Sequence, residues 1–182
     1  NKVKGYDNEP GVILASLLLR DKLNKMGIDA IVEERSVSNY LKKHNLSYEY
    51  SYRATREFLQ DKLKNNSFDL IIDLHRDAVA ESVTKYTKDD VSYARVMFVM
   101  NKDYENIKYA EKLSDIMEKK YKGISRGMYT KHSGSFNQDL DPKAMLIELG
   151  GNYNTMEEVV NTIDVLSLSI KELLEWKKKN KL

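Results

Sequence analysis

The stretch Leu70–Ala78 places the strongest constraint on the fold. It reads Leu-Ile-Ile-Asp-Leu-His-Arg-Asp-Ala, a short apolar run that ends in charged residues. A run of this kind is typical of a strand buried on both faces of a sheet. Ligands of open α/β sheets gather beyond the carboxyl ends of the strands, so His75, Arg76 and Asp77 form a candidate site. The alternative is a histidine whose hydrogen bonds are satisfied where the strand meets a loop.

The composition is that of one globular domain without cysteine chemistry. A length of 182 residues is enough for a substantial core, and 41% hydrophobic and 32% charged residues are ordinary values. The net charge is +2, from 30 basic and 28 acidic residues, which gives no reason to expect a nucleic-acid partner. Cysteine is absent. Disulfides and thiolate metal sites are therefore excluded, and any transition metal must be held by His, Asp or Glu.

The sequence contains no segment that is expected to cross a membrane. Its longest apolar run, Val12–Leu19, is too short to span a bilayer. No signal peptide opens the chain, and residue 1 resembles a cut made inside a longer protein. We therefore expect residues 1–182 to be a single, N-terminally truncated domain.

Helical and strand patterns alternate along the chain. Pro10 and Gly27 are placed to begin and end an apolar first helix, and Thr155 is placed to cap a last helix that runs through Trp176. Three further helices are predicted at Val37–His44, Tyr48–Lys64 and Tyr104–Lys120, and four strands at Ile28–Val32, Leu70–Leu74, Ala94–Met100 and Ala144–Leu149. Residues 79–92 are predicted to form an exposed loop, and residues 123–142 to be irregular. The predicted fold class is α/β, with a mostly parallel central sheet flanked by helices.

A second candidate site residue lies in the stretch Met145–Gly151. There Glu148 interrupts an aliphatic strand just before two glycines. Apolar neighbours raise the pKa of a carboxylate towards the range in which a general base works at neutral pH. The glycines allow a ligand or another backbone to approach closely. The alternative is a glutamate that faces solvent at the edge of the sheet.

Together with Glu9, these residues have the makings of a hydrolytic zinc centre. Glu9 stands immediately before the first helix, where an acidic residue is also commonly a partner of the helix dipole. A catalytic zinc needs about three protein ligands and an open position for water. Zinc lowers the pKa of that water to about 7, and a nearby carboxylate can then relay protons.

Two other catalytic classes do not fit the residues. His-Arg-Asp also occurs in the protein-kinase catalytic loop, but the chain has no glycine-rich loop, and Ser82 holds the position of the kinase asparagine. No serine lies in a Gly-x-Ser-x-Gly elbow, so a Ser-His-Asp hydrolase is unsupported. A magnesium-dependent phosphate-transfer site built on Asp73, Asp77 and Glu148 remains a third alternative.

Five ordered motifs resemble the stage II sporulation protein P family. They are residues 72–78 (Ile-Asp-Leu-His-Arg-Asp-Ala), 94–99 (Ala-Arg-Val-Met-Phe-Val), 124–127 (Ile-Ser-Arg-Gly), 136–140 (Phe-Asn-Gln-Asp-Leu) and 146–151 (Leu-Ile-Glu-Leu-Gly-Gly). The resemblance implies the fold of zinc-dependent N-acetylmuramoyl-L-alanine amidases. It also implies a cell-wall hydrolase that acts in engulfment beside a lytic transglycosylase, on the extracytoplasmic side of the membrane, with an anchoring segment absent from this chain. Peptidoglycan is the implied substrate, cleaved between the muramoyl group and L-alanine, with peptide cross-links as a second target.

The resemblance also assigns roles to individual residues. His75 and Glu9 would ligate Zn²⁺, and Glu148 would be the catalytic carboxylate. Six residues would line or brace the substrate groove: Arg76, Asp77, Arg126, Asn137, Gln138 and Asp139. The hypothesis is that Glu148 takes a proton from the attacking water and passes it to the departing amine.

One departure from the family pattern favours a rival function. The family has another histidine upstream of the first helix, and residues 1–9 contain none, so either the chain begins after that strand or it binds metal poorly. His44 and His132 are the available substitutes, and His132 is the better reserve. The rival is a catalytically incomplete peptidoglycan-binding or scaffold module of the same fold.

Overall fold

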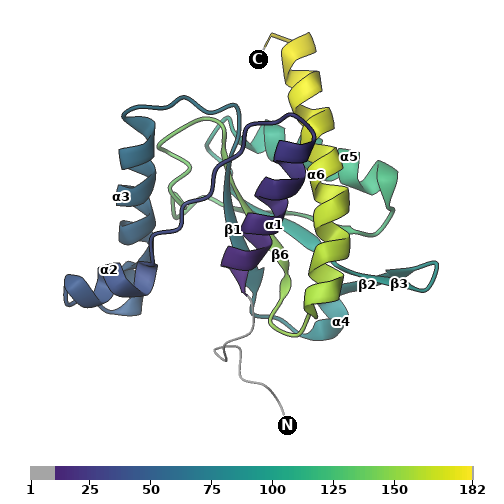
Figure 1. Cartoon of the computed structure of the whole chain (residues 1–182), viewed down its shortest axis with the longest axis horizontal. Helices are drawn as coiled ribbons and strands as arrows, with labels where there is room; N and C mark the ends of the chain where they lie inside the picture. Colours follow the sequence, from purple (N-terminus) through teal and green to yellow (C-terminus); the bar gives the residue numbers. More distant parts are fainter. Residues whose placement is uncertain (1–10, 182) are drawn as a thin grey trace.

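A four-stranded mixed sheet forms the centre of the molecule in the computed structural model, which describes residues 11–181. Its strands are β1 (Ile71–Asp77), β6 (Ala144–Gly151), β4 (Val96–Asn101) and β5 (Ser125–Lys131), in the order β1-β6-β4-β5. Strands β1 and β6 are parallel, as are β4 and β5, and β4 runs antiparallel to β6. The predicted α/β class with a mostly parallel sheet is confirmed (Figure 1).

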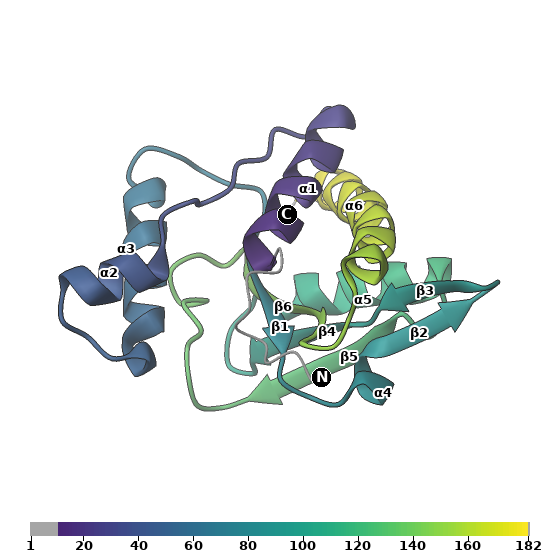
Figure 2. The same ribbon diagram turned by 60° about the horizontal axis from the view of Figure 1, so that its bottom comes forward.

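Three helices cover one face of this sheet. They are α1 (Val12–Lys25), α5 (Ile107–Lys120) and α6 (Met156–Lys179), and Figure 2 shows α1 and α6 side by side above the strands. Leu19, Leu113 and Leu166 from these helices share one buried cluster with Phe98 and Ile147 of the sheet. Because side chains alternate along a strand, residues 146 and 148 of β6 lie on the opposite face, which these helices do not cover.

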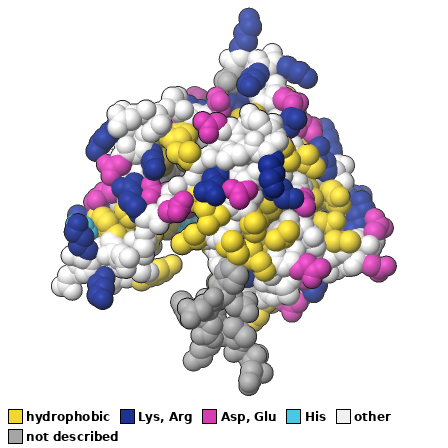
Figure 3. Space-filling view, viewed as in Figure 1, with side chains coloured by type: hydrophobic (Ala, Val, Ile, Leu, Met, Phe, Trp, Pro, Cys, Tyr) yellow, Lys and Arg dark blue, Asp and Glu magenta, His cyan; other side chains and the backbone are white. Residues whose placement is uncertain are grey.

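The helix-covered side of the molecule is seen in Figure 3. Hydrophobic side chains gather on it around α1 and the neighbouring part of α6, with charged side chains between and around them. Ala15, Leu19 and Leu23 of α1 are buried, whereas Ile13 is 57% exposed. The apolar first helix predicted from the sequence is therefore partly covered. Among the described residues, no helix has the length and apolar character needed to cross a membrane.

A separate helical unit lies to one side of the sheet, beside β1 (Figures 1 and 2). It consists of α2 (Val37–Lys43), the 3-10 turn η1 (Tyr48–Tyr50) and α3 (Ser51–Leu63). Its small core contains Leu41, Ala54 and Phe58, with the Tyr40 ring edge-on to Phe58 at 5.6 Å. Both helices occur where the sequence predicts them. The unit matters for the site because it presents α3 to the end of β1.

Most predicted elements are confirmed, with small shifts at their ends. The helix predicted at Tyr104–Lys120 begins at Ile107, and the last helix extends to Lys179. Thr155 caps α6 as predicted, and Glu158 completes a capping box: each residue accepts a hydrogen bond from the backbone N–H of the other. Gly27 follows the end of α1 with φ +77°, a conformation that suits glycine.

Three local predictions were wrong. Residues 79–92 are not a loop but a short helix α4 (Glu81–Thr84) and a hairpin of β2 (Lys85–Lys88) and β3 (Val91–Ala94). The hairpin turn at Asp89-Asp90 has positive φ at both residues, as the twist of a tight hairpin requires, and Tyr86 and Tyr93 pack on each other. The polar, mixed-charge composition of residues 79–92, without clear periodicity, made the segment resemble a loop.

In the other two cases, a predicted strand is absent from the structure and a strand that was not predicted is present. Residues 28–32 are not a strand, because the Ala30 N–H donates to the Asn24 side chain and Ile28 packs on the core cluster without joining the sheet. Residues 125–131, predicted to be irregular, form β5. A register irregularity between Val96 and Phe98 and a positive φ at Gly127 interrupt the alternation that marks a strand in sequence.

A matched pair of leucines on α6 tests this packing. Leu166 is fully buried in the core cluster and Leu168, two residues on, is 50% exposed. Leu166→Ala is expected to lower the free energy of unfolding by about 2–5 kcal/mol through lost burial and the cavity it leaves. Leu168→Ala is expected to change it by less than about 0.5 kcal/mol. Denaturant unfolding monitored by circular dichroism measures both, and equal effects would contradict the assigned orientation of α6.

Candidate active site

The parallel pairing of β1 with β6 brings the two main candidate residues together. In its register His75 lies opposite Glu148, and Asp73 lies opposite Leu146. Residues 73, 75, 146 and 148 all point to the sheet face that α1, α5 and α6 leave free, by the alternation of side chains along each strand. The structure therefore places the imidazole and the carboxylate on neighbouring strand ends of one face.

His75 is held by a carboxylate on its own strand. Its Nε2 lies 3.0 Å from Asp73 Oδ1, a contact between residues two apart that strand geometry places on one face. Burial works to lower the pKa of His75, but the hydrogen bond to Asp73 and the negative charges of Asp73 and Glu148 outweigh it and raise the pKa above 6.5. With Nε2 engaged by Asp73, Nδ1 is the other ring nitrogen that could bind a ligand.

Glu148 has an oxygen that is buried without compensation. Its Oε2 has no hydrogen-bond partner among residues 11–181. Burial raises the pKa of Glu148 above 4.5, and the negative charges of Asp77 and Asp73 add to the effect, while His75 and Arg126 oppose it. A carboxylate with a raised pKa and an unused oxygen has the properties of a general base. An unpaired buried polar atom is costly, so the geometry favours a functional role over a purely structural one.

Tyr52 of α3 lies beside His75 in this site. Its ring lies nearly parallel to that of His75, at 16°, with the centroids 6.1 Å apart, and Phe136 contacts it edge-on at 6.0 Å. Burial, followed by the nearby charges of Asp73 and Glu148, raises the pKa of Tyr52 to about 12. The sequence places Tyr52 in the predicted helix Tyr48–Lys64 but gives no signal that it meets His75.

The two charged neighbours of His75 in the sequence have different surroundings. Asp77 forms an ion pair with Arg126 of β5, with 2.7 Å between Oδ2 and the guanidinium, and both side chains are largely buried. Arg76 points to the other side of the strand, where its guanidinium donates to the backbone carbonyls of Gly151 and Asn154. Asp77 and Arg126 therefore lie near Glu148, whereas Arg76 braces the end of β6.

The side chains of Asn137, Gln138 and Asp139 form hydrogen bonds with other parts of the chain. Gln138 is buried, accepts from the Asn101 N–H and donates to the Val99 carbonyl. Asn137 donates to the Tyr52 carbonyl and to the Thr55 hydroxyl of α3. Asp139 accepts two hydrogen bonds from Arg56. The predicted groove residues Asn137 and Asp139 thus attach α3 to this loop, and Gln138 attaches the loop to β4.

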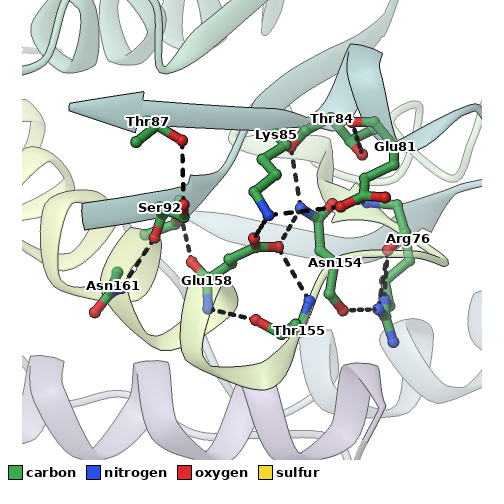
Figure 4. Close-up of polar contacts among 12 residues, drawn as sticks. Arg76, Glu81, Thr84, Lys85, Thr87, Ser92, Asn154, Thr155, Glu158 and Asn161 are labelled. Atoms are coloured by element: carbon green, nitrogen blue, oxygen red, sulfur yellow. Dashed lines mark hydrogen bonds and ion pairs between the residues drawn. The ribbon is translucent and has the colours of Figure 1, made fainter. Parts of the chain in front are cut away.

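A polar network fixes the turn between β6 and α6 (Figure 4). Glu158 is buried and pairs with Lys85 at 2.7 Å, while Asn154 donates to Glu158 and accepts from the Gly151 N–H. The two glycines leave room for this arrangement: a Cβ on Gly150 would lie 2.6 Å from the Asn154 side chain, and one on Gly151 would lie 2.9 Å from the Asp77 carbonyl. The close approach that the sequence indicated at Gly150-Gly151 is therefore made by protein atoms.

The two reserve histidines form their contacts away from this site, and one further candidate is not described. Glu9 lies outside the described residues. His44 ends α2 and packs on Tyr40, with 4.3 Å between ring centroids. His132 is exposed and lies 3.2 Å from Asp103. Within residues 11–181, neither histidine forms a possible metal-binding group with His75.

The residues present fit part of a metal site. A metal-binding histidine is normally oriented by a carboxylate on its other nitrogen, as Asp73 orients His75. The unpartnered Oε2 of Glu148 lies on the neighbouring strand. Within residues 11–181, however, no group of three or more His, Asp or Glu residues is arranged to hold a metal ion. Asp73 and Asp77 have His75 and Arg126 as partners, which also weakens the magnesium alternative.

Sequence comparison decides the family. The sequence profile described as stage II sporulation protein P matches residues 1–171. The chain belongs to the stage II sporulation protein P family. A curated relative, stage II sporulation protein P of Bacillus subtilis strain 168, is 38% identical over 161 residues, which is 84% of this chain. The chain spans 40% of the length of that relative.

Structural comparison supports the same fold. The chain is similar to the CwlD amidase of Clostridioides difficile, solved in complex with the GerS lipoprotein, with a TM-score of 0.58. The match covers 88% of this chain and 83% of that chain, at 13% sequence identity. The family resemblance and the amidase-like α/β fold expected from the sequence are therefore both confirmed.

The Glu158 network predicts a pH-dependent contribution to stability. Burial raises the pKa of Glu158, but hydrogen bonds from Lys85, Asn154 and the Thr155 N–H outweigh it and hold the pKa below 4.5. Its stabilising effect is complete above pH 4.5 and is lost as the pH falls through the lower value in the folded protein.

Glu158→Gln is therefore expected to lower the free energy of unfolding by about 1–3 kcal/mol at pH 7, and the difference is expected to shrink as the pH falls below 4.5. Urea unfolding across this pH range measures the difference. Glu157→Gln, at the exposed neighbouring position, is the matched control and is expected to have little effect. A constant difference between Glu158→Gln and the unmodified chain at all pH values would contradict the ionic role.

Proposed function

We propose that this chain is the catalytic domain of a sporulation cell-wall hydrolase that cleaves the amide bond between N-acetylmuramic acid and L-alanine. Membership of the stage II sporulation protein P family and the fold shared with an amidase support this class of activity. Peptide cross-links of peptidoglycan are proposed as a second target. The proposed location is the extracytoplasmic side of the membrane, with a lytic transglycosylase and other engulfment proteins as partners.

The unpartnered oxygen of Glu148 is the observation that carries the proposal. A buried carboxylate oxygen beside a carboxylate-oriented histidine is costly unless a ligand or reactant uses it. Hydrolysis of an amide needs a base for the attacking water and an acid for the departing amine. Glu148 can perform both, since its raised pKa brings the two protonation states closer in energy at neutral pH.

His75 is the proposed zinc ligand among the described residues, and Glu9 is proposed as a second one. Zinc bound there would polarise the scissile carbonyl and lower the pKa of a water to about 7. Asp73 keeps the His75 ring oriented through Nε2. Glu148 accepts the proton of the attacking water at Oε2 and then delivers it to the amine nitrogen of L-alanine. Next to Glu148, the ion pair between Asp77 and Arg126 compensates the negative charge of Asp77.

Glu148→Gln tests the proposed base. Glutamine keeps the shape of the side chain but cannot take up a proton, so hydrolysis of purified peptidoglycan is expected to fall by about 10²–10⁴-fold. Mass spectrometry of the released stem peptides, which begin with L-alanine, measures both the rate and the bond that is cleaved. Circular dichroism should show an unchanged fold. Full turnover in this variant would refute the role of Glu148.

His75→Ala tests the proposed metal ligand. Removing an imidazole ligand is expected to lower the zinc content of protein loaded with Zn²⁺ and then desalted, as measured by elemental mass spectrometry. His132→Ala, which removes an exposed histidine, is the control and should retain the zinc of the unmodified chain. If the unmodified chain cosediments with purified cell walls but neither binds zinc nor releases stem peptides, the peptidoglycan-binding module is the better description.

A further inference from the structure

We propose that Tyr52 is a substrate-contacting residue of this site and that Asn137, Asp139 and Arg56 are positioning residues that act through it. The inference rests on the proposed function and adds a recognition wall to it, on a helix outside the central sheet. The proposed ligand of the Tyr52 ring is the sugar side of the scissile bond, whose C–H face is apolar and suits an aromatic surface.

The location of Tyr52 is the first step of the argument. Its ring stacks on His75, with 6.1 Å between the ring centroids, and His75 lies opposite Glu148 in the register of β1 and β6. The residue is nevertheless 38% exposed. An aromatic side chain fixed between His75 and Phe136, yet partly open, is a ready contact surface for a ligand that reaches Glu148.

The way in which α3 is attached is the second step. Asp139 binds Arg56 through both oxygens, at 3.0 and 2.6 Å, and Arg56 lies one helical turn after Tyr52. Asn137 donates to the carbonyl of Tyr52 itself, at 3.2 Å, and to the Thr55 hydroxyl, at 3.0 Å. These contacts join a loop after β5 to the segment of α3 that carries the ring.

The backbone of that loop is the third step. Phe136 and Asn137 both have left-handed conformations, with φ +48° and +56°, which is unfavourable for a residue as large as phenylalanine. Such strain persists where surrounding contacts fix it, and it is common at ligand sites. Here it places the Phe136 ring against Tyr52 and the Asn137 amide against α3. The loop conformation therefore serves the position of Tyr52.

The first experiment compares Tyr52→Phe with Tyr52→Ala on soluble peptidoglycan fragments that contain the muramoyl–L-alanine bond. Tyr52→Phe keeps the ring, so its rise in KM is expected to be clearly smaller than that of Tyr52→Ala. Tyr52→Ala removes the contact, so its KM is expected to rise by about tenfold, with a smaller change in kcat. An unchanged KM for Tyr52→Ala, or an equal loss in both variants, would overturn the proposed ring contact.

The second experiment asks whether Asp139 acts through Tyr52. Asp139→Asn is expected to raise KM by about fivefold in the unmodified chain and to have no further effect in Tyr52→Ala, since the two residues share one function. Asp61→Asn is the matched control: it breaks ion pairs of the same helix with Arg35 and Lys64, and its KM should be unchanged. Additive effects of Asp139→Asn and Tyr52→Ala would overturn the positioning role.

A binding measurement separates this inference from the proposed hydrolysis. Affinity for peptide-free glycan strands is measured for the same variants by fluorescence titration. If the unmodified chain releases no stem peptides, the proposed function fails, yet weaker glycan binding by Tyr52→Ala and Asp139→Asn still supports the contact. Equal glycan affinity in all variants would overturn it whether or not the chain is active.

Discussion

The register between β1 and β6 is the constraint on which the rest of the structure depends. A slip of one residue would turn every side chain of a strand to the other face of the sheet. Ile72 and Leu74 of β1 and Ile147 and Leu149 of β6 prevent this, because they pack with the helix-covered core. The same burial that fixes these aliphatic residues leaves Asp73, His75 and Glu148 on the free face. The hydrophobic core of this protein therefore determines the geometry of the candidate site, whose residues lie on the two strands β1 and β6.

The residues at the end of β6 position the candidate site without taking part in its proposed chemistry. Gly150 and Gly151 bring the backbone so close to Asn154 and Asp77 that any side chain would clash. Asn154 links this turn to Glu158, and Arg76 links it to β1 through the carbonyls of Gly151 and Asn154. Many of the polar residues around His75 and Glu148 thus fix the ends of β1 and β6, and fewer are available for the proposed chemistry.

What the sequence predicted, and what it did not, follows from the range of the interactions. The strands around His75 and Glu148 were predicted from local apolar runs, and their meeting follows from a general rule for α/β sheets. The contact between Tyr52 and His75 was not predictable, because it depends on a loop more than eighty residues away that attaches α3 through Asn137. The β2–β3 hairpin was missed because its strands are short and its segment is polar, mixed in charge and without clear periodicity. Residues 28–32 have the composition of a strand but pair with no other strand.

Three carboxylates lie in or beside this site, and their partners divide their roles. Asp73 contacts His75 and Asp77 contacts Arg126, so the charge of each is compensated by a neighbour. Glu148 is buried with an oxygen that no described residue pairs with, next to negative charges that make its ionisation less favourable. A sequence selected for stability alone would pair that oxygen or replace the side chain with an apolar one. The unpaired oxygen at position 148 therefore costs stability, which is what the proposed role of Glu148 as a general base would account for.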